Sequence, residues 1–254
     1  MRRAVAICDV GGLTAAAISA RVNLSALLLT RGRWPEARSV AERAVADSRL
    51  LGSRPGATFP LVALGRILLL LGERQEGVRI LEEARELATT FGFVPGLLYA
   101  GEALAWQEVR DGRPAEAIAR LEPLLQQARN IGDEWCQSVY VWAQLELGGD
   151  QRADEVLRDL RQQQLARRSR AGRPKVLLQS ARLAFRQGRR EAALRDLEEG
   201  LTIARGLGLA HDEALLLEEC GRLPEALTLF QRLGARPDAE RIAPTLGGVT
   251  LPAS

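Results

Sequence analysis

The sequence predicts an all-α protein built as a solenoid of about six stacked pairs of antiparallel helices. Three observations support this prediction. Short segments that begin with glycine and resemble Gly-Arg-x-x-Glu-Ala recur about every 40 residues, and a second series of glycines keeps the same period. No segment alternates apolar and polar residues between hairpin turns, as strands do. A helix pair cannot bury its apolar face alone, so successive pairs must stack on one another.

The first glycine series marks the turn inside each predicted helix pair. Glycine tolerates the left-handed backbone conformation that closes a helix, so each of these glycines is expected directly after the first helix of its pair. The segments GRWPEA, GERQEG, GRPAEA, GGDQRA, GRREAA and GRLPEA begin at Gly32, Gly72, Gly112, Gly148, Gly188 and Gly221.

The second glycine series marks the turns between pairs. Gly12, Gly52, Gly92 and Gly132 lie 40 residues apart, and the series recurs at Gly208. Between the marks, apolar residues fall at helical spacing, as at Leu64, Leu68 and Leu71. The two series together predict units over residues 12–51, 52–91, 92–131, 132–170, 171–207 and 208–235.

The two ends of the chain do not complete a unit. Residues 1–11 are expected to form either the second half of a helix whose partner is missing or a short N-terminal cap. The first alternative would make the chain a fragment of a longer product. Residues 236–254 are expected to form a short C-terminal cap and a flexible tail, because the last residues contain proline, glycine and threonine without periodicity.

Over residues 12–235 the chain resembles the tetratricopeptide repeat (TPR) family. The resemblance depends on Leu-small pairs in the first helices, on small residues early in the second helices, and on the aromatic turn residue Trp34. The pairs are Leu24-Ser25, Leu64-Gly65 and Leu104-Ala105, and the small residues are Ala37, Gly77 and Ala117. It implies a right-handed α-α superhelix of about six TPR-like helix pairs that binds protein segments on its concave face.

The period departs from the family pattern. It is 40 residues, whereas TPR units have about 34, and the early tryptophan and closing proline of the family are absent. Longer units of this kind resemble the helical arms of bacterial maltose-regulator-like proteins and STAND ATPases. That resemblance implies a regulatory arm in signal transduction or transcription regulation.

Composition argues against an enzyme. The three cysteines are widely spaced and His211 is the only histidine, so no metal-ligand motif is present and we expect no metal and no cofactor. No phosphate-binding GxxxxGK[ST] loop occurs. His211 is expected to cap a helix or lie on the surface. Paired glutamates next to arginines, such as Glu82 and Glu83 beside Arg85, are typical of solvated helix faces. No catalytic residue is predicted.

Six of the eleven aromatic residues fall on one face of the predicted first helices, when positions are counted back from the small residues of each unit. Aromatic and arginine side chains dominate the binding energy of protein interfaces. The face is therefore predicted to be a partner-binding groove; the alternative is that the aromatics fill the core between the helices. The predicted groove residues are Phe59, Arg66, Tyr99, Glu102, Trp106, Arg110, Trp135, Trp142, Lys175, Arg182 and Phe185.

Charge is unevenly distributed along the chain, although its net value is only +3. Residues 161–190 contain ten basic residues and no acidic residue. Clustered arginines can neutralise phosphates, but no helix-turn-helix pattern or interleaved aromatics accompany them, and a solvated or partner-facing surface is the favoured interpretation. The candidate basic patch comprises Arg167, Arg168, Arg170, Arg173, Arg189 and Arg190.

The function that the sequence favours is that of a non-enzymatic scaffold, which binds a protein or peptide segment in its concave face. The first alternative is a regulatory or effector-sensing C-terminal arm, or a detached fragment, of a larger bacterial NTPase, adenylate cyclase or transcription regulator, which would bind its own other domains or an effector. A nucleic-acid-binding solenoid is the least favoured. Few cysteines and the lack of a long apolar run predict a cytoplasmic protein without membrane contact.

Overall fold

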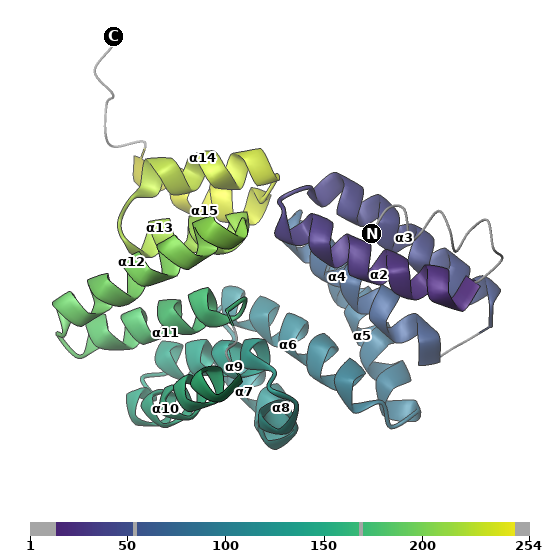
Figure 1. The fold of residues 1–254 in the computed structure, drawn as a ribbon, viewed down its shortest axis with the longest axis horizontal. Helices are drawn as coiled ribbons and strands as arrows, with labels where there is room; N and C mark the ends of the chain where they lie inside the picture. The colour runs from purple at the N-terminus through teal and green to yellow at the C-terminus, as the bar shows by residue number, and fades with distance from the viewer. Residues whose placement is uncertain (1–13, 53–54, 168–169, 247–254) are drawn as a thin grey trace, which may run out of the picture.

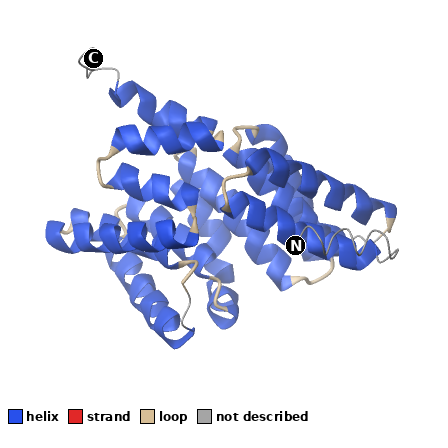
Figure 2. Cartoon of the chain, turned by 45° about the horizontal axis from the view of Figure 1, so that its top comes forward, coloured by secondary structure: helices blue, strands red, loops and turns tan. Residues whose placement is uncertain are grey.

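The structure is a computed structural model that describes residues 14–52, 55–167 and 170–246. These residues form helices joined by short turns, and no strand occurs among them (Figure 2). The predicted all-α solenoid is confirmed. The expected N-terminal partial helix, most of the C-terminal tail and the patch residue Arg168 lie outside the described residues.

Six antiparallel helix pairs follow one another along the chain, and α15 (Arg236–Leu246) packs against the last of them (Figure 1). The pairs are α2 (Thr14–Thr30) with α3 (Trp34–Leu50), α4 (Thr58–Leu70) with α5 (Arg74–Thr90), α6 (Val94–Arg110) with α7 (Pro114–Leu121) and α8 (Leu125–Ile131), α9 (Glu134–Glu146) with α10 (Asp150–Arg167), α11 (Arg173–Arg186) with α12 (Arg190–Leu207), and α13 (Ala210–Glu219) with α14 (Leu223–Leu233). Two 3-10 turns, η1 (Pro55–Ala57) and η2 (Glu122–Leu124), precede α4 and α8.

The glycines of both series end helices as predicted, wherever the structure describes them. Gly72 is representative: its φ is 86°, a conformation that only glycine adopts without strain. The amide of Gly72 donates to the carbonyl oxygen of Leu69, and the amide of Glu73 donates to that of Leu68, at 3.1 and 2.8 Å. This is the Schellman arrangement, which satisfies the last carbonyl groups of α4.

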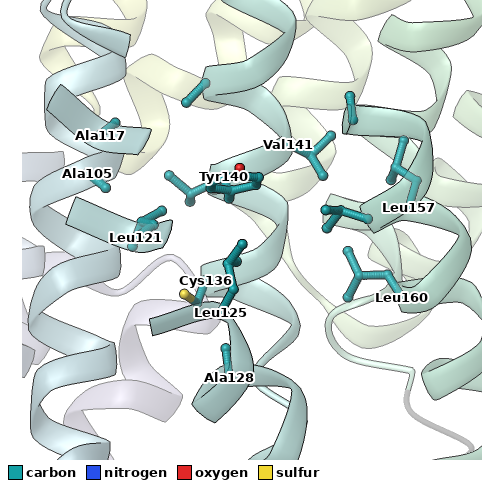
Figure 3. Packing of buried hydrophobic residues seen from close by; sticks show 14 of the residues in the cluster. Ala105, Ala117, Leu121, Leu125, Ala128, Cys136, Tyr140, Val141, Leu157 and Leu160 are labelled. Carbon is teal, nitrogen blue, oxygen red and sulfur yellow. The ribbon is translucent and has the colours of Figure 1, made fainter. Parts of the chain in front are cut away.

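Three hydrophobic clusters run along the solenoid, each shared by neighbouring pairs. Figure 3 shows part of the middle cluster, where Leu121 of α7 faces Tyr140 of α9 and Leu157 comes from α10. Each helix pair therefore buries its apolar face against its neighbours, as stacked repeats require.

Helices α4 and α5 approach each other so closely that two facing positions must be glycine. A Cβ atom on Gly77 would lie 2.8 Å from a methyl carbon of Leu69 and 3.0 Å from the carbonyl oxygen of Gly65. A Cβ atom on Gly65 would lie 3.1 Å from the carbonyl oxygen of Gly77. The small residue that marks the start of the second helix is thus explained by helix packing.

We expect Gly77→Ala to lower the free energy of unfolding by about 1–3 kcal/mol, because the added methyl group overpacks the contact between α4 and α5. The matched control is Gly206→Ala in α12, where a Cβ atom would meet nothing within 4 Å. There the substitution should raise stability by up to about 1 kcal/mol through helix propensity. Urea denaturation followed by circular dichroism measures both changes, and equal effects of the two variants would contradict the packing argument.

The first and last helix pairs touch each other, so the solenoid closes into a ring (Figure 1). Trp34, at the start of α3, is fully buried in a cluster whose other buried members all come from residues 178–242. A Cβ atom on Gly32 would lie 2.5 Å from Leu233 Cδ2, and one on Gly72 would lie 3.4 Å from Pro237. The first helices of the pairs therefore face a central lumen that is partly open to solvent.

Candidate functional site

The lumen of the ring is lined by the first helices of the pairs and by α15. It contains two cavities, which we call the small cavity, of about 180 Å³, and the large cavity, of about 650 Å³. Four side chains border both of them, so the two cavities are neighbouring parts of one lumen. The shared residues are Leu69, Trp106, Lys175 and Leu215.

Two ion pairs and a tryptophan form the polar wall of the small cavity. The Arg66 guanidinium lies 2.9 Å from the Glu102 carboxylate, and the Lys175 ammonium lies 2.6 Å from that of Asp212. Both cations also contact the indole of Trp135: Arg66 Cζ lies 4.6 Å and Lys175 Nζ 5.0 Å from the ring centroid. Such cation–π contacts hold the basic groups at the lumen wall.

Glu102 is the most deeply buried of the charged residues that line the small cavity, with 5% of its surface exposed. Burial raises the pKa of its carboxyl group, and the charge of Arg66 offsets part of that effect. Its Oε2 atom accepts no hydrogen bond of normal geometry. This atom is nevertheless the one that pairs with Nη1 of Arg66 at 2.9 Å. A carboxylate has about four acceptor positions, so Glu102 keeps acceptor capacity beyond this ion pair.

The large cavity is lined by basic and aromatic side chains. Arg110 Cζ lies 4.6 Å from the ring centroid of Trp106, and Arg182 Cζ lies 5.3 Å from that of Trp142. Its lining includes five basic residues, namely Arg74, Arg110, Lys175, Arg182 and Arg241, and two acidic residues, Asp111 and Glu146. Each of these basic side chains has a carboxylate partner, and four of those partners lie outside the lining: Asp212, Glu218, Glu219 and Asp238.

Eight of the eleven predicted groove residues line the two cavities, and the other three do not. Phe59 instead packs against Tyr99 and Phe93. The centroid of its ring lies 5.9 Å from that of Tyr99 and 5.1 Å from that of Phe93. Phe185 packs against the last hydrophobic cluster. The eight lining residues are Arg66, Glu102, Trp106, Arg110, Trp135, Trp142, Lys175 and Arg182.

The lumen tryptophans border open space and also contact the core. Trp106 and Trp142 are half-buried and pack against the middle hydrophobic cluster, and each lines the large cavity. Trp106 and Trp142 therefore contact both the hydrophobic core and the cavity, and each of the two alternatives from the sequence describes part of their surroundings.

His211 differs from its expected position as a helix cap or surface residue. Its side chain is only 16% exposed, and its ring stacks edge-on against Trp34 and Phe230, with centroids 5.5 and 5.9 Å away. Its Nε2 atom lies 3.2 Å from Oδ2 of Asp238. The expectation was wrong because ring closure places the first pair over the start of α13.

Asp238 in α15 lines neither cavity, but it is a second buried residue with contacts that the sequence did not indicate. Its side chain is 1% exposed and contacts Arg110 of α6, His211 of α13 and Arg241 of its own helix. Burial raises the pKa of this carboxyl group, but hydrogen bonds and charges from His211 and Arg110 outweigh burial and hold the pKa well below its usual range. Asp238 thus joins three helices around the lumen as an ionised group.

The described arginines of the candidate basic patch lie at two separate places. Arg167 donates to the carbonyl oxygen of Asn130 at 3.2 Å, and Arg173, at the start of α11, pairs with Glu199 at 2.5 Å. Arg189 and Arg190 follow the opposite end of α11 and are exposed, as is Arg170 near its start. A helix of 14 residues is about 21 Å long, so these side chains do not form one continuous phosphate-binding surface.

The described ranges contain no candidate metal site. There, no group of three or more histidine, cysteine or acidic side chains could hold a metal ion. Burial raises the pKa of the Cys136 thiol, which opposes its use as a nucleophile. In the same part of the chain, no helix has the length and apolar character to cross a membrane.

Comparisons with known proteins support the repeat fold. Residues 18–43 and 59–83 match the family model of a tetratricopeptide repeat. A crystal structure of TPR-like repeats, from a Podosopora anserina protein described as a putative kinesin light chain, has a TM-score of 0.51 with 21% identity; it covers 73% of this chain and 94% of that chain. A crystal structure of a variant of the same protein gives a TM-score of 0.52 with 20% identity, and covers 73% of this chain and 93% of that chain. No curated protein matches the chain significantly.

Proposed function

We propose that this chain is a non-enzymatic binding scaffold that holds an acidic segment of a partner protein in the large cavity. The single observation that carries the proposal is the lining of that cavity, in which five basic side chains stand against two acidic ones and beside two tryptophans. The repeats matched by the TPR model are of a kind that typically mediates protein–protein interaction. A cytoplasmic location is part of the proposal.

The basic groups of the large cavity retain hydrogen-bonding capacity for a ligand. Arg182 pairs with Glu219 at 2.7 Å and Arg241 pairs with Glu218, yet neither glutamate belongs to the cavity lining. An arginine has five N–H donors in a planar fork, so one carboxylate partner does not exhaust it. Carboxylates of an incoming segment would meet the remaining donors, while its apolar side chains would contact Trp106 and Trp142.

One observation favours a second candidate, a regulatory arm of a larger bacterial signalling ATPase or transcription regulator. Both the first and the last helix pairs contribute to the lining of the small cavity, so a ligand there would contact both ends of the solenoid. An effector-sensing arm needs such a contact, because a ligand shifts a conformational equilibrium only through unequal affinity for its states.

The first candidate predicts that a random peptide library selected on the protein will yield segments in which Asp or Glu flanks an aromatic or aliphatic residue. Trp142→Ala should weaken the selected peptides by about 2 kcal/mol, roughly thirty-fold in Kd, if Trp142 is an anchor. Arg182→Gln should weaken them and reduce the salt dependence of binding. Fluorescence anisotropy with labelled peptides measures both effects.

The matched control for Arg182→Gln is Arg158→Gln on α10. Arg158 is an exposed arginine that pairs with Asp154 on its own helix and lies outside both cavities. It should leave affinity unchanged. Selected peptides without an acidic preference, or equal losses in Arg182→Gln and Arg158→Gln, would overturn the proposal.

A further inference from the structure

The small cavity is lined by residues from both ends of the solenoid and from the pairs between them. Trp34 comes from the first pair and Asp212 and Leu215 come from the last, while Arg66 and Glu102 come from the second and third pairs. A cavity of about 150 Å³ is large enough to hold benzene, so about 180 Å³ accommodates a small metabolite and no peptide chain.

The polar groups of this wall have hydrogen-bonding capacity that the protein does not use. Among the described residues, the Arg66 guanidinium has one ion-pair partner, Glu102, and otherwise contacts the face of Trp135. The Glu102 carboxylate pairs with Arg66 through Oε2, and its other acceptor positions have no hydrogen bond among the described residues. Lys175 donates to Asp212 and has two further N–H donors. The wall therefore offers spare donors and a spare acceptor close together.

The charges around the small cavity balance. The charged groups are two cations, Arg66 and Lys175, and two carboxylates, Glu102 and Asp212. The lining also includes His211, which contacts the Asp238 carboxylate, and is otherwise largely indole and leucine. A ligand with a net charge would leave one buried charge without compensation, which is costly. A ligand that carries one positive and one negative group matches all four residues, and its apolar part would contact Leu69, Leu215 and Trp106.

We propose that the small cavity binds a zwitterion of the size of an α-amino acid. Its carboxylate would accept hydrogen bonds from Arg66 and Lys175, and its ammonium group would donate to Glu102 and Asp212. The ligand would contact the first and last helix pairs together, so it binds the closed ring and stabilises it. The small cavity shares Leu69, Trp106, Lys175 and Leu215 with the large cavity, but the ligand class inferred here does not depend on the proposed function.

The test is thermal unfolding of the purified chain with each of the twenty common L-amino acids at 10 mM, followed by calorimetric titration of those that stabilise it. At least one should raise the Tm by several degrees. For L-leucine, 3-methylbutylamine and 4-methylpentanoate provide matched probes that lack the carboxylate or the ammonium group. The corresponding amine and acid of any stabilising amino acid should bind at least tenfold more weakly.

Variants of the ion pair locate the site. Glu102→Gln keeps the shape of the side chain and should weaken the amino acid at least tenfold, with little change for the acid lacking an ammonium group. Arg66→Gln should also weaken the amino acid at least tenfold, with little change for the amine that lacks a carboxylate. The control, Glu76→Gln, removes an exposed carboxylate that pairs with Arg79 on α5 and should bind like the wild type.

Three results would overturn this inference: no amino acid raises the Tm, the amine or acid alone binds as tightly as the amino acid, or Glu102→Gln and Arg66→Gln bind it unchanged. If either variant fails to fold, the matched amine and acid probes on the wild-type chain still decide the ligand class. If the amino-acid test fails, the proposed function is still decided separately, by the peptide selection.

Discussion

Trp34→Ala is expected to lower the free energy of unfolding by about 3–5 kcal/mol, the usual loss for a buried tryptophan, and to open the ring. Trp34 is fully buried; its indole N–H donates to the carbonyl oxygen of Leu29 at 3.0 Å, and its ring packs against His211. Truncation removes an apolar contact by which the first pair is attached to the last. The remaining stack would still be held by contacts between neighbouring pairs.

Urea denaturation measures the loss of stability, and small-angle X-ray scattering measures ring opening as a larger radius of gyration. Trp34→Phe keeps an aromatic ring and should retain the compact shape with a smaller loss. Trp142→Ala is the control for the loss of any tryptophan, because Trp142 is half-buried and lines the lumen away from this contact. An unchanged radius of gyration in Trp34→Ala, with a stability loss no larger than in Trp142→Ala, would contradict ring closure by Trp34.

The helix pairs could be predicted from sequence because their boundaries depend on local conformation. A glycine such as Gly72 adopts a positive φ that other residues rarely adopt, so its spacing along the chain reports helix ends directly. Gly77 could be identified for a similar reason, since close packing of two helices excludes a side chain there. Both signals depend on one residue and its immediate neighbours.

Ring closure could not be predicted, because it depends on small rotations between units that accumulate over the whole solenoid. No single residue encodes that sum. Trp34 was identified only as a turn aromatic, yet it is buried against the last pair. His211 and Asp238 were missed as a site for the same reason, since one begins a short helix and the other lies in the expected cap. Counting helical positions found Trp106 and Trp142 because that argument needs only the register within one unit.

Asp238→Asn is expected to destabilise the protein by about 3–5 kcal/mol at neutral pH, as removal of one partner from a buried ion pair does. The substitution leaves Arg110 without its carboxylate partner, and the side chain of Arg110 is only 12% exposed. Arg241 keeps Glu218 as a partner and is more exposed, so most of the loss should come from Arg110.

The effect of Asp238 should depend on pH in a defined direction. The folded protein holds the pKa of Asp238 below its usual range, whereas the unfolded chain has a value of about 3.9. The stabilisation is therefore fully present above about pH 5 and is lost as the pH falls through about 4 toward the lower folded-state value. Urea denaturation of wild type and Asp238→Asn at pH 5, 4 and 3 should show a stability difference that is largest at pH 5 and shrinks at the two lower values.

Asp154→Asn is the control for this titration, because Asp154 is a surface carboxylate that pairs with Arg158 within α10. Exposed pairs contribute about 0–1 kcal/mol, so this variant should follow the wild type closely at every pH. A difference between wild type and Asp238→Asn that stays constant down to pH 3 would mean that the carboxylate charge does not stabilise the ring. Packing around Ile242 and the ion pair between Arg241 and Glu218 would then hold α15 in place.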